Sequence, residues 1–248
     1  MRSFFSDIFL KFFVYLTMGA LAVLTLSCEE DDGPMMPDIS NPTGNSMSYS
    51  LASVSDPAVS GSATFTELED GSTQLTIDLN GTTSGTHPAH IHMNAAATGG
   101  DIAISLTPVN GSTGMSETII ETLDDGTSIS YDQLLDFDGY INVHLSSSDL
   151  ATLIAQGDIG QNELTGESKT YSLMEKDVAG IMGSVTFEKR LNGNTLATIM
   201  LEGTPDGGMH PAHIHMNSAA EGGGIAVSFT PVDGTSGMSV TDISMTDD

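Results

Sequence analysis

The chain has little or no tryptophan, cysteine, lysine and arginine, and the shortages of cysteine and of basic residues each exclude a class of protein. It has no tryptophan, one cysteine, and six lysine and arginine residues among 248. The lone Cys28 excludes an internal disulfide and any site built from several thiolates. The 33 acidic residues bring the formal charge to −27, which argues against nucleic-acid binding because phosphate backbones would be repelled. Hydrophobic residues still make up 39% and occur in alternating runs, so we expect a folded, soluble chain.

Long apolar runs are also scarce, and the longest lies near the start of the chain. It covers residues 12–26 and follows the basic residues Arg2 and Lys11. A membrane-spanning helix needs about 20 apolar residues, and this run is shorter. The pattern therefore predicts a secretory signal peptide over 1–27.

A lipid anchor is expected directly after this leader. Residues 24–28, Leu-Thr-Leu-Ser-Cys, resemble the lipobox of bacterial lipoproteins, in which cleavage before the cysteine leaves it to carry lipid. The acidic residues 29–32 resemble the surface-export signal of some outer-membrane lipoproteins, and residues 28–47 are expected to form a flexible tether. We therefore expect an extracytoplasmic protein held at the outer membrane or cell surface by lipid on Cys28. The alternative is a signal anchor in which Cys28 stays unmodified.

An internal duplication organises the rest of the chain. The motif His-Pro-Ala-His-Ile-His-Met occurs at 87–93 and again at 210–216, and shorter motifs around it recur in the same order. We expect a first domain over 48–168 and a second over 169–248. The last third of the first domain has no counterpart in the second, which is therefore expected to be truncated at its C-terminal end.

Alternating and β-branched segments indicate an all-β fold in each repeat. The strands expected in the first repeat are 50–54, 62–68, 73–79, 89–93, 101–106, 117–121, 140–145 and 159–164. Turn signals such as Asp70-Gly71 and Asn80-Gly81 separate them. About eight strands in about 120 residues favour a β-sandwich or a barrel. One helix is expected over 149–155, with Ser148 as its N-cap.

The histidines gather in the two copies of the heptapeptide and in one further expected strand. They are His87, His90, His92, His144, His210, His213 and His215. Because residues two apart share a face of a strand, His90 and His92 should project together, opposite Ile91. The same rule places His144 opposite Val143. Two imidazoles from one strand and one from a neighbour would form the nitrogen-rich site that copper or zinc prefers.

The remaining histidines extend this hypothesis and leave an alternative open. His87 is a candidate fourth ligand, and His210, His213 and His215 would supply at most three ligands in the second repeat. Copper is favoured slightly over zinc, because the chain has no second thiol and is expected outside the cytoplasm. In the alternative, the imidazoles bind no metal and only order the fold through hydrogen bonds to the backbone.

Several of these segments together resemble the CHRD domain, a family named from chordin and found in many bacterial secreted proteins. The segments are Ala89-His-Ile-His92, Gly139-Tyr-Ile-Asn-Val-His144, Gly157-Asp-Ile-Gly160 and Leu164-Thr-Gly166. The resemblance covers 49–166 fully and 171–248 in part. It implies an immunoglobulin-like Greek-key β-sandwich related to copper/zinc superoxide dismutase, with His90, His92 and His144 where copper ligands stand.

Three functions remain open from the sequence. The leading hypothesis is a lipoprotein that displays tandem CHRD-like binding modules with a copper or zinc site, towards an extracellular protein or glycan partner. A dismutase-like copper enzyme is the second. Against it, residues 94–130 contain no histidine that could serve as a bridging ligand, and an acidic surface would repel superoxide. The third is a structural or adhesive module without metal.

Overall fold

Antiparallel β-strands form nearly all of the regular secondary structure in the computed structural model, which describes residues 40–55 and 58–244. The all-β prediction is therefore confirmed. The expected signal peptide, Cys28 with its lipobox, and the acidic run after it lie outside the described residues.

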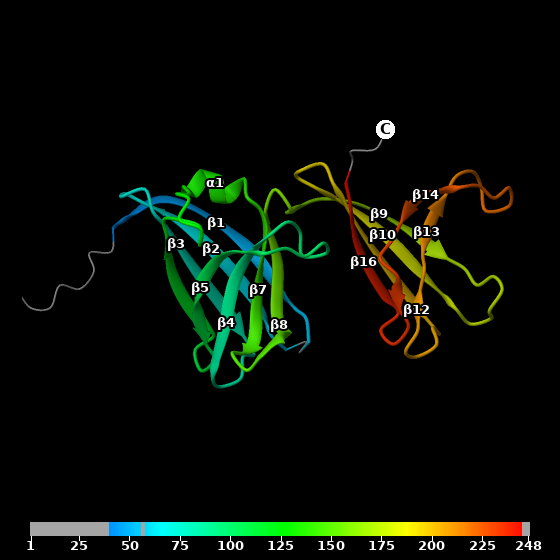
Figure 1. Cartoon of the computed structure of the whole chain (residues 1–248), viewed down its shortest axis with the longest axis horizontal. Coiled ribbons are helices and arrows are strands. Elements are labelled where there is room, and N and C mark those ends of the chain that lie inside the picture. Colours follow the sequence, from blue (N-terminus) through cyan, green and yellow to red (C-terminus); the bar gives the residue numbers. More distant parts are fainter. Residues whose placement is uncertain (1–39, 56–57, 245–248) are drawn as a thin grey trace, which may run out of the picture. The chain divides into compact units, whose positions relative to one another are not determined.

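The first repeat closes into a barrel of eight strands (Figure 1). Its strands are β1 (Pro42–Ser53), β2 (Ser60–Leu68), β3 (Thr73–Asn80), β4 (Thr86–Met93), β5 (Ile102–Asn110), β6 (Met115–Ile120), β7 (Asp138–Ser146) and β8 (Asp149–Gly160). The hydrogen-bonded order is β1-β2-β3-β6-β5-β4-β7-β8, so the chain crosses over β6 and β5 between β3 and β4. Two seams are narrow: β5 pairs with β6 at Asn110 and Met115, and β1 pairs with β8 over Ala52 and Ser53.

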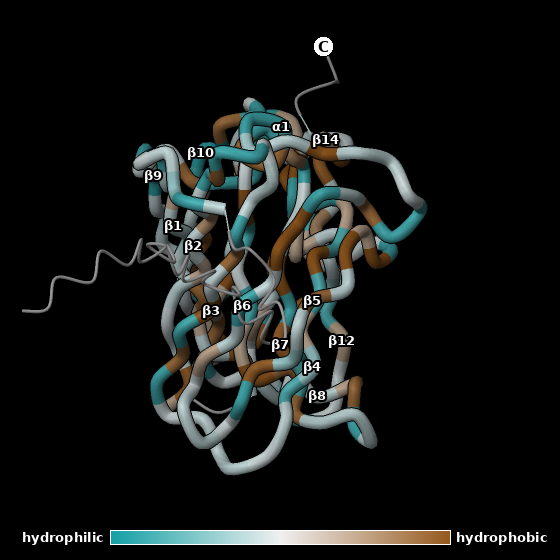
Figure 2. The backbone as a smooth tube through the Cα atoms, turned by 90° about the vertical axis from the view of Figure 1, so that its left-hand side faces the viewer, coloured by the Kyte–Doolittle hydropathy of each residue, from teal (hydrophilic) through white to brown (hydrophobic). Residues whose placement is uncertain are grey.

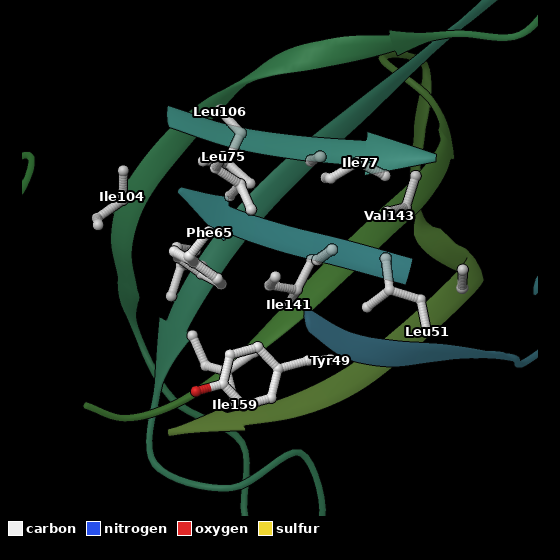
Figure 3. Packing of buried hydrophobic residues seen from close by; sticks show 14 of the residues in the cluster. Tyr49, Leu51, Phe65, Leu75, Ile77, Ile104, Leu106, Ile141, Val143 and Ile159 are labelled. Atoms are coloured by element: carbon white, nitrogen blue, oxygen red, sulfur yellow. The ribbon is translucent and has the colours of Figure 1, made fainter. Parts of the chain in front are cut away.

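Strand alternation places apolar residues inside the barrel and polar residues outside, and Figure 2 shows the hydropathy of the residues changing repeatedly along the strands. In β3, Leu75, Ile77 and Leu79 are buried, whereas Asp78 is exposed. Figure 3 shows Leu75 and Ile77 packing with Phe65 from β2 and Ile141 from β7. Burial of each such side chain contributes about 1.5–3 kcal/mol relative to exposure.

The prediction of a helix over 149–155 is wrong, because these residues form the first part of β8. They pair with β7, Ala155 opposite Val143, and Ile154 and Ala155 enter the barrel core. Pairing and burial outweigh the helix preference of a segment rich in Leu and Ala.

The helix that the structure does contain is α1 (Tyr131–Leu135). Ser130 is its N-cap and forms a capping box with Gln133, while Tyr131 and Leu134 are buried. None of the helices among residues 40–55 and 58–244 has the length and apolar character needed to cross a membrane.

The start of β1 also differs from the expectation. Residues 42–47, assigned from the sequence to the flexible tether, belong to β1, where Ser46 pairs with Thr66 and Met47 with Phe65. Their polar composition indicated a linker, but their backbone groups pair with β2.

The second repeat forms an open sheet and two short strand pairs. Its strands are β9 (Leu164–Leu173), β10 (Met182–Arg190), β11 (Thr195–Glu202), β12 (Met209–His210), β13 (His213–His215), β14 (Ile225–Ser228), β15 (Val232–Asp233) and β16 (Met238–Ile243). The sheet order is β16-β11-β10-β9, with β12 paired to β15 and β13 to β14. The expected domain boundary at 168 falls within β9. Among the described residues, no strands of this repeat correspond to β7 and β8.

A buried cluster of charges joins the two repeats. The Arg190 side chain is fully buried, and its Nη1 lies 2.8 Å from Asp158 Oδ2 at the end of β8. Its Nε lies 2.8 Å from Asp242 Oδ1 on β16. This contact is an ion pair, but its geometry is not that of a hydrogen bond. Nη1 also donates to the Asn162 carbonyl. The repeat places Leu68 at the position equivalent to Arg190, so this cluster has no counterpart in the first repeat.

Candidate metal-binding site

Two neighbouring strands carry the candidate ligands. β4 and β7 pair with Ala89 opposite Val143 and Ile91 opposite Ile141, and these four side chains point into the core. Because alternate residues face opposite ways, His90 and His92 of β4 and His144 of β7 fall on the outer face of the barrel. The sequence-predicted alternation of His90 and His92 with Ile91, and of His144 with Val143, is confirmed.

Three imidazoles meet on this outer face. His90, His92 and His144 each offer a ring nitrogen, and these nitrogens lie within 4.8 Å of one another. His90 Nδ1 is 3.1 Å from His144 Nε2, and the His90 and His92 rings are 5.9 Å apart. The group could hold a metal ion, as the histidine spacing predicts.

Backbone carbonyls fix two of the three rings. His92 Nδ1 lies 3.0 Å from the Gly100 carbonyl oxygen, and His144 Nδ1 lies 2.7 Å from that of Leu150. A carbonyl oxygen can only accept, so each Nδ1 carries the hydrogen and each Nε2 keeps a lone pair. His92 Nε2 is buried and has no hydrogen-bond partner in the described part of the chain. Metal-binding histidines characteristically donate their other N–H to a carbonyl in this way.

Tyr140 supports the same arrangement, and the sequence reasoning missed it. Its ring stacks on His92 with centroids 4.9 Å apart, and its hydroxyl accepts a hydrogen bond from the Gly100 N–H at 3.2 Å. Gly100 must be glycine, because a Cβ there would lie 2.0 Å from the Met93 carbonyl oxygen. Tyr140 is four residues before His144 on the same strand, so strand alternation could have placed it on this face.

Asp158 of β8 anchors the loop between β4 and β5 through a hydrogen bond. One carboxylate oxygen, Oδ1, accepts the Ala96 N–H at 2.8 Å, while Oδ2 faces Arg190. The same loop supplies Gly100, whose carbonyl orients His92. The position of His92 therefore depends on contacts that reach the end of β8.

The environment favours neutral imidazoles. Burial lowers the pKa of His90, and the neighbouring His144 and His92 lower it further, with Asp124 opposing them. Burial is also the main cause of the lowered pKa of His144. A neutral ring has the free lone pair that a metal ion requires.

The donor set fits zinc or copper. Three imidazoles without thiolate or carboxylate, and with one position left for water or another ligand, match the nitrogen-rich sites that these metals occupy. Two nitrogens bound tetrahedrally to zinc at about 2.0–2.1 Å lie about 3.3 Å apart. The 3.1 Å between His90 Nδ1 and His144 Nε2 is close to that separation.

His87 does not join this group. It is 2% exposed, and its two ring nitrogens lie 2.8 Å from the Leu145 carbonyl oxygen and 3.0 Å from that of Thr83. It lies three positions before His90, and this odd offset turns it to the opposite face of the strand. The expectation of a fourth ligand overlooked this alternation rule.

The second repeat reproduces only part of the site. The His213 and His215 rings are 5.9 Å apart, and His215 Nδ1 lies 2.9 Å from the Gly223 carbonyl oxygen, as His92 does from Gly100. His210 lies on β12, and its buried Nε2 has no partner in the described residues. The strand that would bring a third imidazole is the counterpart of β7, so no group of three ligands forms there within the described chain.

Comparisons of the chain with protein-family models, with curated proteins and with solved structures found no match. The functional argument therefore rests on the geometry of the histidine group.

Proposed function

We propose that this chain is a lipoprotein of the bacterial outer membrane or cell surface whose first β-module binds one copper or zinc ion. His90, His92 and His144 would hold the ion, and Gly100 and Leu150 would orient two of the rings. The observation that carries the proposal is the convergence of three imidazoles, two of which have their far nitrogens fixed by backbone carbonyls. A bound ion would supply a Lewis-acidic centre, and copper would add one-electron redox chemistry.

The repeats are proposed to be CHRD-like, with a Greek-key β-sandwich that is complete in the first repeat and incomplete in the second. The crossing of β6 and β5 by the β3–β4 connection supports a Greek key. The narrow seams between β5 and β6 and between β1 and β8 support two four-stranded layers. Lipid on Cys28 would anchor the modules, which would face an extracellular protein or glycan partner.

Binding is favoured over superoxide turnover. Residues 40–168 contain no lysine or arginine, and the nearest arginine, Arg190, is buried between Asp158 and Asp242. Nothing in the barrel would attract an anionic substrate to the histidine group.

Metal uptake tests the proposal. The full chain is dialysed with one equivalent of Cu²⁺ or Zn²⁺, and the bound metal is measured by mass spectrometry. We expect tight binding at one site per chain, lost in His90→Ala/His92→Ala. The matched control is His213→Ala/His215→Ala, which removes the same pair from the second repeat and should leave that binding unchanged. Absence of uptake, or equal loss in both variants, would overturn the proposal.

A further inference from the structure

A row of three methionines lies exposed on the outer face of the second repeat's sheet. Met182, Met200 and Met238 belong to the neighbouring strands β10, β11 and β16, and they are 42%, 55% and 40% exposed. Strand alternation turns them away from the core, because Val185 and Ile199, at odd offsets on the same strands, are buried. Core packing therefore does not account for these methionines.

Strand register brings the three thioethers side by side. Met200 pairs directly with Met238, so these two side chains share a face and are cross-strand neighbours. On its other side Met200 pairs with Ser184, and Met182 lies two residues before Ser184, which makes Met182 a diagonal neighbour of Met200. Neighbours of both kinds are within reach of long side chains. Met200 is thus flanked by a methionine on each side.

The first repeat has the same strand register at these positions but different residues. The equivalent residues are Ser60, Asp78 and Met115, of which Asp78 pairs with Met115. Since both sheets share the register, the architecture alone does not require methionine at all three positions. The row is a feature of the second repeat.

The surroundings of the row are polar. The neighbouring outward residues of β9 and β10 are small and hydroxylic, and the Thr170 and Thr186 hydroxyls lie 2.9 Å apart in a hydrogen bond. Protein-binding surfaces are marked by large contiguous apolar patches, and three methionines beside serines and threonines do not form one. Glu202, which pairs with Met182, is exposed and places a carboxylate next to the row.

We propose that Met182, Met200 and Met238 bind one Cu(I) ion. A thioether sulfur is neutral and polarisable, and soft sulfur ligands select Cu(I) over the harder divalent ions. Three neutral ligands leave the ion its positive charge, which the Glu202 carboxylate and the acidic chain, with a formal charge of −27, offset. This inference does not depend on metal binding at the histidine group.

Competition with a Cu(I) chelator tests the site. The starting protein is the full chain carrying His90→Ala/His92→Ala, so that the histidine group does not compete, and Cu(I) is supplied as its bicinchoninate complex under anaerobic conditions. We expect the protein to withdraw copper from the coloured complex, and X-ray absorption to show sulfur around the bound ion. Met182→Leu/Met200→Leu/Met238→Leu should remove one equivalent of this binding, because leucine has a similar volume but no sulfur.

Two comparisons locate the ion. Met115→Leu/Met209→Leu/Met216→Leu removes three exposed methionines that no strand pairing joins to another methionine, and it should leave Cu(I) binding unchanged. Among single variants, Met200→Leu should weaken binding more than Met182→Leu, because only Met200 neighbours both other sulfurs.

Three outcomes would overturn the proposal. The first is failure of the starting protein to withdraw Cu(I) from the chelator. The second is full retention of Cu(I) after Met182→Leu/Met200→Leu/Met238→Leu. The third is an equal loss in the two triple variants. Because the starting protein lacks His90 and His92, each of these outcomes leaves the proposed histidine site to be judged by its own uptake measurement.

Discussion

At the scale of single residues, the hydrogen bonds behind the imidazoles decide what the histidine group can do. His92 and His144 turn Nε2 outward because Gly100 and Leu150 hold their Nδ1–H groups. Strand alternation makes the pairing of His90 with His92 predictable from the sequence. The carbonyls that orient the rings belong to the backbone, so no side-chain pattern marks them.

Removal of the Tyr140 hydroxyl should weaken metal binding. Tyr140→Phe keeps the ring stacked on His92 but leaves the Gly100 N–H without its acceptor. Outer groups that orient ligands are worth about 10–100-fold in affinity, and we expect the lower end because Tyr140 acts through Gly100. Competition titration with Zn²⁺ measures the change, with the exposed Tyr171→Phe as the control. Equal zinc affinities of Tyr140→Phe and the parent chain would show that the Tyr140 hydroxyl is not needed for metal binding.

Acidification should destabilise the metal-free protein before carboxylates titrate. The pKa values of His90 and His144 are lowered mainly by burial, with His92 lowering and Asp124 raising the value for His90. The unfolded chain therefore takes up protons first, so stability is complete above about pH 6.5 and falls as the pH drops below it. Urea unfolding between about pH 7.5 and about pH 5 measures the slope. His90→Gln/His144→Gln should flatten it, and an unchanged slope would contradict this assignment.

At the scale of elements, the β7–β8 hairpin both closes the barrel and carries His144. The alternation in β4 and β7 is readable from the sequence, whereas β8 resembles a helix because Leu and Ala dominate its first half. Its strand conformation depends on β7 and on β1, which lies about 100 residues earlier along the chain. Contacts this distant in sequence leave no local signal.

Shortening a buried side chain of this hairpin should destabilise the protein. Ile141 is fully buried between β4 and β8, so Ile141→Ala should lower the free energy of unfolding by about 2–5 kcal/mol. Leu150→Ala, at a residue 50% exposed on β8, should change it by less than about 0.5 kcal/mol. Urea unfolding followed by circular dichroism compares the two, since the chain has no tryptophan. Similar values for both variants would contradict the hairpin's role in closing the core.

At the scale of the whole molecule, Arg190 ties the second repeat to the first. Arg190→Ala should lower the free energy of unfolding by about 3–5 kcal/mol, because it leaves the Asp158 and Asp242 carboxylates largely buried without their cation. Lys189→Ala removes an exposed neighbour whose Nζ is 3.6 Å from Glu167, and it should cost at most about 1 kcal/mol. Chemical unfolding compares the two variants. Equally small losses in the free energy of unfolding would mean that the Arg190 cluster does not stabilise the protein.

Anchoring belongs to the same scale. Cys28→Ser should move the protein from the membrane fraction to the aqueous phase on detergent partitioning, because the lipid is proposed to be the anchor. Retention of the Cys28→Ser variant in the membrane would favour the alternative of an uncleaved signal anchor.

The carboxylate of Asp158 faces two ways, with one oxygen on Ala96 in the loop that orients His92 and the other on Arg190 of the second repeat. We therefore expect metal affinity and attachment of the second repeat to be thermodynamically linked, in which case each strengthens the other by the same factor. Zinc should raise the midpoint of unfolding of the second repeat, although no ligand comes from it. Arg190→Met should abolish that rise, and its persistence would place the linkage elsewhere. A change in how firmly the second repeat is attached would then alter how tightly the first repeat retains its ion.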